Sequence, residues 1–191
     1  MPTLSMIPDL PQSSLDRDTV AKIVRRFERE TGLRFVAAGG PADSPLDTRW
    51  YCASDKVLHI DLIVDRQLGL RWITVDDPDQ ARLERLFSAL VRAQPPLTVE
   101  DVASQRRPLP EKVLPVALAL VSNGGSDPRT AEAVEGALGS PDLETRANGV
   151  IAASLAPSAQ GYAALQRAWA AETDEGLRRM IAGALALAAP R

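Results

Sequence analysis

The segment Pro141-Asp-Leu-Glu-Thr-Arg-Ala-Asn-Gly-Val-Ile-Ala-Ala-Ser-Leu-Ala156 recurs in diverged form as Thr173-Asp-Glu-Gly-Leu-Arg-Arg-Met-Ile-Ala-Gly-Ala-Leu-Ala-Leu-Ala188, at an offset of 32 residues. The residues before each segment also align, at an offset of 31. The matched pairs are Asp142 with Asp174, Arg146 with Arg178, Val134 with Leu165, Ala137 with Ala168, and Leu138 with Trp169. Self-similarity at a fixed period is typical of helical repeat proteins. The sequence therefore predicts that the second half of the chain consists of duplicated helix pairs.

Alanine and glycine are frequent in both copies, and such small residues let neighbouring helices pack closely. Larger side chains, among them Leu165 and Trp169, are expected to fill the remaining interior space. Asp, Ser or Thr stands near the start of the segments, as N-caps require. We expect helices at about 111–122, 128–138, 141–155, 158–171 and 173–188.

The duplicated unit resembles the short bacterial type of HEAT-like repeat, in which an Asp near the start and a later Arg recur as Asp142 and Arg146 do here. The resemblance covers roughly residues 111–189, with two well-matched units and a degenerate first one. Pro115 and the segment Asn123-Gly-Gly125 depart from the family pattern. Because the family motif encodes packing and capping, the resemblance implies a protein-binding surface and no catalytic residue.

A proline-rich segment precedes the repeats. Gln94–Pro110 holds four prolines in 17 residues, which excludes long regular structure and leaves room for one short turn beginning at Thr98. We therefore expect two domains, 1–95 and 111–191, joined by a linker at 96–110.

The N-terminal domain is predicted to begin with a helix at about 15–31, because Val20, Ile23, Val24 and Phe27 form one apolar stripe. Its candidate N-caps are Ser13, Ser14 and Asp16, and Gly32 is placed to end it. A second helix is predicted to start at Asp77-Pro78 and to end near Ala93.

Strands are predicted between these helices, at about 33–38, 48–54, 57–64 and 68–75, with a tight turn at 54–57. Period-two alternation places Leu58, Ile60, Leu62 and Val64 on one buried face. The order helix, three or four antiparallel strands, helix predicts an α+β domain with both helices on the apolar face of the sheet. This order is loosely similar to the start of bacterial secretion-chaperone domains.

Composition and charge disfavour several classes of function. A net charge of −3 and a pI near 5.3 argue against a non-specific nucleic-acid binder or a polybasic membrane surface. No apolar run approaches the roughly 20 residues that cross a bilayer. One His and one Cys permit no His/Cys metal cluster, so we expect no metal and no cofactor. The N-terminus lacks a signal-peptide pattern and Cys52 has no disulfide partner, so a cytoplasmic location is expected.

Exposed arginines and one tryptophan are the candidate interaction residues: Arg25, Arg26, Arg29, Trp50, Arg178 and Arg179. A second candidate site depends on the turn. If Asp55-Lys56 forms its centre, Cys52 lies opposite His59 on the face that also carries Asp61. A thiol, an imidazole and a carboxylate would then meet, as in a nucleophile with its base and orienting group.

Two functions are therefore considered. The first is a non-enzymatic adaptor, chaperone or immunity-type protein that binds another protein through its helical repeats. The alternative is a small hydrolase or enzyme subunit that uses Cys52, His59 and Asp61. Nucleic-acid binding is disfavoured by the charge, although Arg106 and Arg107 could cluster with Arg178 and Arg179.

Overall fold

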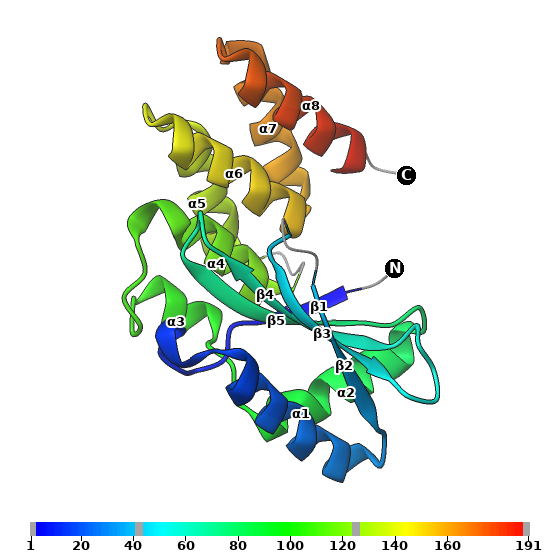
Figure 1. Cartoon of the computed structure of the whole chain (residues 1–191). Helices are drawn as coiled ribbons and strands as arrows, with labels where there is room; N and C mark the ends of the chain where they lie inside the picture. The colour runs from blue at the N-terminus through cyan, green and yellow to red at the C-terminus, as the bar shows by residue number, and fades with distance from the viewer. Residues whose placement is uncertain (1–2, 41–43, 124–126, 189–191) are drawn as a thin grey trace. The chain divides into compact units, whose positions relative to one another are not determined.

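The chain divides into two compact units, Met1–Leu97 and Thr98–Arg191. The computed structural model describes residues 3–40, 44–123 and 127–188 (Figure 1). The first unit is an α+β unit with an antiparallel sheet, and the second is helical throughout its described residues. This agrees with the predicted fold class. None of the described helices has the length and apolar composition needed to cross a membrane.

The sheet of the first unit has five antiparallel strands in the order β1-β5-β4-β3-β2. The strands are β1 (Thr3–Met6), β2 (Phe35–Gly39), β3 (Leu46–Cys52), β4 (His59–Asp65) and β5 (Leu70–Asp76). Four of them correspond to the predicted strands. The fifth, β1, forms an edge of the sheet beside β5 and was not predicted, because four residues are too few to show a convincing alternation.

Local capping chemistry determines where the two helices of this unit begin. In α1 (Arg17–Thr31), the Asp16 carboxylate accepts from the Thr19 backbone N–H at 2.8 Å, and Gly32 ends the helix at a φ of 73°. In α2 (Gln80–Ala93) the N-cap is Asp79. The predicted start at Asp77-Pro78 is wrong, because the buried Asp77 carboxylate instead accepts from the Asp79 N–H and from the guanidinium of Arg82.

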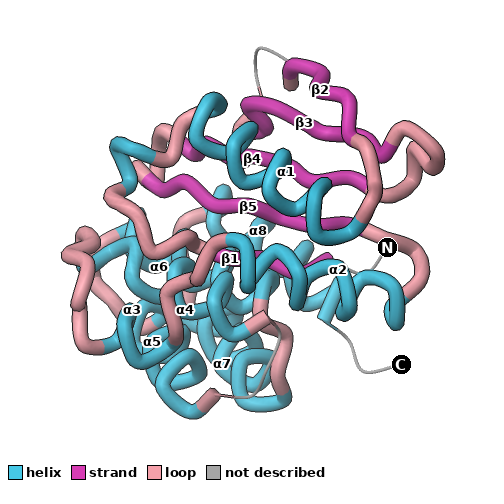
Figure 2. The backbone as a smooth tube through the Cα atoms, turned by 90° about the horizontal axis from the view of Figure 1, so that it is seen from below, coloured by secondary structure: helices cyan, strands magenta, loops and turns pink. Residues whose placement is uncertain are grey.

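Both helices lie on one face of the sheet (Figure 2). Ile60 and Leu62 of β4 are fully buried there against Phe27 of α1 and Leu83 of α2. Burial of a large aliphatic side chain contributes about 1.5–3 kcal/mol, so this layer is the main source of stability in the unit. The predicted alternation of β4 is confirmed.

The two ends of the first unit pair with each other. The Asp9 N–H donates to the Pro95 carbonyl at 2.9 Å, and the Leu97 N–H donates to the Ile7 carbonyl at 2.8 Å. The segment that follows contains the short turn expected at Thr98. Thr98 and Asp101 form a reciprocal capping box that starts the short helix α3 (Val99–Ala103), and α3 packs on α4 of the second unit.

The helices of the second unit closely match the predicted ones. They are α4 (Leu114–Ser122), preceded by a 3₁₀ turn at Glu111–Val113, α5 (Pro128–Leu138), α6 (Leu143–Leu155), α7 (Ala159–Ala171) and α8 (Glu175–Ala188). Pro115 lies in the first turn of α4, where its missing N–H costs no helical hydrogen bond. Asn123 ends α4 in the left-handed region, at a φ of 48°. Gly124, Gly125 and the last three residues of the predicted domain lie outside the described residues.

The helix pairs stack in two rows. Helix α6 packs between α4 and α8 in one row, and α5 packs beside α7 in the other. Gly149 allows α6 to approach α5, since a Cβ at this position would lie 3.0 Å from the Leu138 backbone nitrogen and 3.1 Å from the Ala137 Cβ. The pairs α5/α6 and α7/α8 correspond to the two copies seen in the sequence.

The packing predicts unequal effects of two substitutions in the sheet. Leu62→Ala should lower the free energy of unfolding by about 2–5 kcal/mol, because it removes methyl groups from a fully buried site. Val36→Ala, on a strand but 62% exposed, should change it by less than about 0.5 kcal/mol. Urea unfolding followed by circular dichroism measures both. Equal effects would contradict the assignment of faces.

Candidate functional site

The register between β3 and β4 decides which side chains can act together. Tyr51 pairs with His59, and Arg49 pairs with Asp61. The connection consists of the six residues 53–58 instead of the predicted four-residue turn, and the Cys52 N–H donates to the Leu58 carbonyl. A change of one residue in register moves a side chain to the opposite face.

Cys52 therefore does not lie on the face that carries His59. The thiol is 1% exposed, belongs to the core under the helices, and has its sulfur 3.3 Å from the Ser54 hydroxyl. Trp50 is buried in the same core, so its assignment to an interaction surface is wrong. The predicted patch of Cys52, His59 and Asp61 is not formed, because only His59 and Asp61 share a face.

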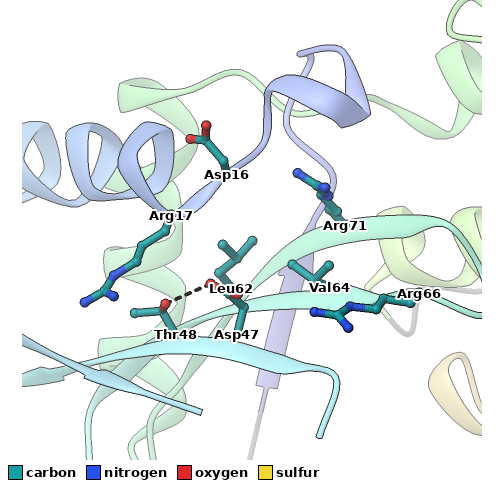
Figure 3. Close-up of a pocket in the computed structure, with 8 residues that line it drawn as sticks. All are labelled: Asp16, Arg17, Asp47, Thr48, Leu62, Val64, Arg66 and Arg71. Atoms are coloured by element: carbon teal, nitrogen blue, oxygen red, sulfur yellow. Dashed lines mark hydrogen bonds between the residues drawn. The ribbon is translucent and has the colours of Figure 1, made fainter. Parts of the chain in front are cut away.

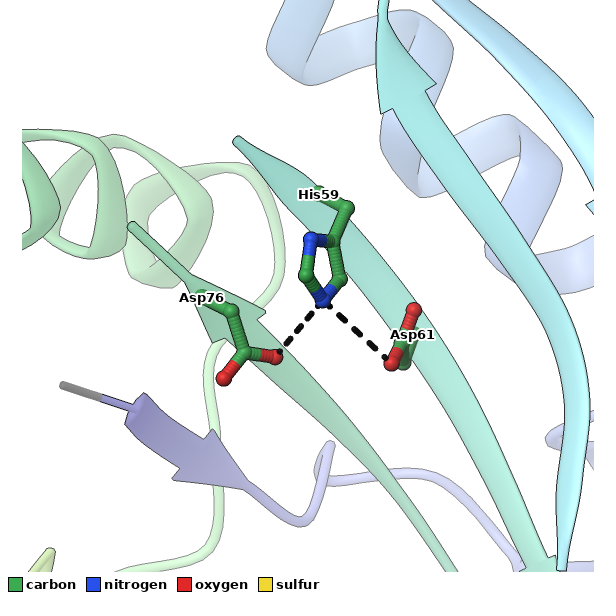
Figure 4. A group of neighbouring side chains, drawn as sticks. All are labelled: His59, Asp61 and Asp76. Carbon is green, nitrogen blue, oxygen red and sulfur yellow. Dashed lines mark ion pairs between the residues drawn. The ribbon is translucent and has the colours of Figure 1, made fainter. Parts of the chain in front are cut away.

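The other face of the sheet brings His59 and Asp61 together with Asp76 of β5 (Figure 4). His59 and Asp76 are direct cross-strand partners. The His59 Nε2 lies 3.3 Å from one Asp76 carboxylate oxygen and 3.8 Å from one Asp61 oxygen. The name polar cluster is used below for these three residues.

Each member of the polar cluster is oriented by a further group. The His59 Nδ1 lies 3.1 Å from the Val57 carbonyl, which can only accept. Arg49 donates through Nε and Nη2 to the two oxygens of Asp61, at 2.7 and 2.5 Å, and this carboxylate raises the pKa of Arg49 above its usual value. The Thr3 hydroxyl donates to Asp76. The cluster thus combines an imidazole nitrogen with two held carboxylates, a donor set that suits a metal ion.

Asp76 was missed by the sequence analysis, although a signal for it exists. In β5, Trp72, Thr74 and Asp76 alternate with the buried Ile73 and Val75. Pairing this alternation with that of β4 puts Asp76 beside His59. Predicting this pairing requires knowledge of how long the connections on both sides of β4 are. The sequence pattern does not determine these lengths.

A second feature of this unit is a hollow of about 330 Å³ (Figure 3). Its charged lining consists of Asp16, Asp47, Arg17, Arg66 and Arg71. Asp16 is the N-cap of α1, and the guanidinium of Arg71 donates to the Leu15 carbonyl, just before α1, at 3.0 Å. Because acidic and basic side chains line the hollow together, its charge favours no class of ligand.

The predicted arginine surface on α1 is exposed. Arg25, Arg26 and Arg29 all lie on the solvent side of the helix. Glu30 lies 3.9 Å from the guanidinium of Arg26 and 3.9 Å from that of Arg92, so part of this positive charge is balanced. Exposed pairs of this kind contribute little to stability.

In the second unit, Trp169 was predicted to be interior and is 44% exposed. The guanidinium of Arg178 lies over the Trp169 ring, 5.3 Å from its centroid. Arg179 is also exposed. A tryptophan held in an exposed position by an arginine is a feature of protein contact surfaces, where both residue types are enriched.

Two ion pairs connect the two repeat copies: the exposed pair of Arg167 on α7 with Glu135 on α5, and the less exposed pair of Arg146 with Glu172. Arg146 of α6 donates to the Glu172 carboxylate, which precedes α8, with a shortest distance of 2.8 Å. The guanidinium and the N–H groups of Asp174 and Thr173 together lower the pKa of Glu172 to about 2. The Arg of the repeat motif is thus used to join one pair of helices to the next.

Comparison of the chain with protein-family models, with curated proteins and with solved structures finds no match.

The burial of Cys52 predicts that its thiol reacts slowly with thiol reagents. Native protein should react with DTNB on the order of 100-fold more slowly than protein unfolded in guanidinium chloride, because the sulfur is reached only by opening of the core. Absorbance at 412 nm follows the reaction. Rapid modification of the native protein would contradict the register described above.

The Arg146–Glu172 pair predicts a pH-dependent stability. Because the pKa of Glu172 is lowered from its ordinary value of 4.5 to about 2, its contribution is present above pH 4.5 and is lost as the pH falls towards 2. Glu172→Gln should therefore melt at a lower temperature than the wild type at pH 7, and the difference should shrink over that range. Glu132→Gln, an exposed site on α5, serves as the control. A difference that persists at low pH would refute the assignment.

Proposed function

We propose that the protein is a non-enzymatic, protein-binding protein of the adaptor, chaperone or immunity type, and that its contact surface includes the outer side of the α7/α8 pair. One observation carries the proposal. Trp169 and Arg178 are exposed there and stacked on each other. This pair is called the Trp169/Arg178 surface below.

The internal repeat indicates what this surface would bind. Leu138 occupies in α5 the position that Trp169 occupies in α7, and it is only 7% exposed; its side chain packs on Gly149 of α6 and lines a hollow together with Ala164 of α7. Arg146 occupies the position of Arg178, and it binds Glu172 of the following pair. Both residues therefore meet the next helix pair, whereas their counterparts in α7/α8 meet none among the described residues.

A partner that uses the same contacts would present a helix pair with a carboxylate near the start of one helix. That carboxylate would take the place at Arg178 that Glu172 takes at Arg146. A flat apolar patch would cover the Trp169 ring. Buried Trp and Arg residues are the types that most often dominate binding energy at protein interfaces.

The hydrolase alternative loses its basis, because it requires Cys52 beside His59 and these side chains lie on opposite faces of the sheet. Binding through the α1 arginines has weaker support, since Glu30 balances part of their charge.

The proposal is tested by affinity capture with four forms of the full chain: wild type, Trp169→Ala, Arg178→Glu and the control Glu132→Ala. We expect wild type and control to retain the same partner, and each of the other two variants to bind it at least about 30-fold more weakly, the loss of an interface hot spot. Replacing the acidic residue of the partner by Arg should restore binding to Arg178→Glu. Equal binding by all four forms would overturn the proposal.

A further inference from the structure

We propose that the polar cluster, His59, Asp61 and Asp76, binds one divalent transition-metal ion of the zinc type. The site belongs to the α+β unit and is independent of the Trp169/Arg178 surface. Its three ligand atoms would be the His59 Nε2 and one carboxylate oxygen from each aspartate. Zinc accepts this mixture of imidazole nitrogen and carboxylate oxygen, and three protein ligands leave its fourth position to water.

The backbone holds the three ligands in place. His59 and Asp61 are two residues apart on β4 and therefore point to the same face, and Asp76 is the cross-strand partner of His59 on β5. The ligand atoms of the cluster all lie within 4.8 Å of one another. Ligands about 2.0–2.2 Å from a tetrahedral metal lie roughly 3.4 Å apart. The separation of 3.3 Å between His59 and Asp76 already fits, and the 3.8 Å separation from Asp61 requires only a small side-chain rotation.

The hydrogen bonding of His59 leaves a place for a cation between the three side chains. Because the Val57 carbonyl only accepts, Nδ1 carries the ring proton of neutral His59. The Nε2 then presents a lone pair towards oxygens of Asp61 and Asp76, and these atoms repel one another. A metal ion placed between them would accept a lone pair from Nε2 and one from an oxygen of each carboxylate.

A proton on Nε2 is the competing occupant, but it can bond to only one of the two carboxylates. An N–H donor can bond to Asp76 at 3.3 Å, but the Asp61 oxygen at 3.8 Å is beyond hydrogen-bonding distance. A metal ion can bind both. The charge also permits one, since Arg49 neutralises Asp61 while Asp76 has a hydroxyl as its partner.

The surroundings of the cluster match those of known metal ligands. A ligating histidine nearly always donates its other ring N–H to a carbonyl or carboxylate, and ligating carboxylates accept hydrogen bonds from neighbouring groups. Val57, Arg49 and Thr3 supply these contacts. The Asp76 side chain is 14% exposed and gives the ion a route from solvent. The low count of His and Cys does not oppose such a site, because two of the ligands are aspartates.

The test uses the full chain after dialysis against a chelator, titrated with zinc chloride by isothermal calorimetry. We expect one ion per chain for the wild type. His59→Gln and Asp76→Asn should each weaken binding by about 100-fold or more, since loss of a ligand should exceed the 10–100-fold cost of losing a second-shell contact. The control Cys52→Ser removes the thiol and should bind zinc like the wild type. Zinc should also raise the Tm of the wild type and of the control.

Absence of saturable binding to the wild type would overturn the proposal. So would binding that survives in both His59→Gln and Asp76→Asn. Circular dichroism establishes that each variant is folded. If His59→Gln does not fold, Asp76→Asn still tests the site, because the Asp76 side chain is more exposed than that of His59.

Discussion

The pairing register of β4 is the constraint on which the chemistry of the α+β unit depends. In a strand, each side chain belongs to one of two faces, and the connection to β3 selects which. Here the residues 53–58 place Ile60 and Leu62 under the helices and leave His59 and Asp61 on the opposite face. The same register sends Cys52 into the core. One more or one fewer residue in this connection would exchange the two sets and destroy both the core and the polar cluster.

Most of the fold follows from patterns local in the sequence. The apolar stripe before Gly32, the alternation in β4 and the duplicated segments all repeat over several turns or residues, so their elements were predicted closely. Non-local features were not. The partner of His59 is Asp76, 17 positions away, and the capping role expected of Asp77 falls to Asp79 because Arg82 binds Asp77. Such competition between neighbouring polar groups is decided in space and leaves no periodic signal.

Trp169 illustrates a different limit of sequence reasoning. Its aligned counterpart Leu138 is buried, so the repeat pattern alone predicts burial for both. Within the described residues, a helix pair follows α5/α6 and none follows α7/α8. A large apolar side chain is buried or exposed at this repeat position according to the place of its helix in the stack. A local sequence pattern does not encode that place. The candidate contact surface therefore consists of positions that are used for packing in one copy of the repeat and are exposed in the other.

The pairing of Ile7 with Leu97 has a consequence for how the protein could evolve. The chain leaves the α+β unit at Leu97, where two backbone hydrogen bonds hold it to the segment that follows β1. The core cluster around the sheet draws only on residues that precede Leu97 in the sequence. A recombination event at this junction would transfer the sheet with its two helices as a complete cassette, and would join a different C-terminal module without opening the hydrophobic layer.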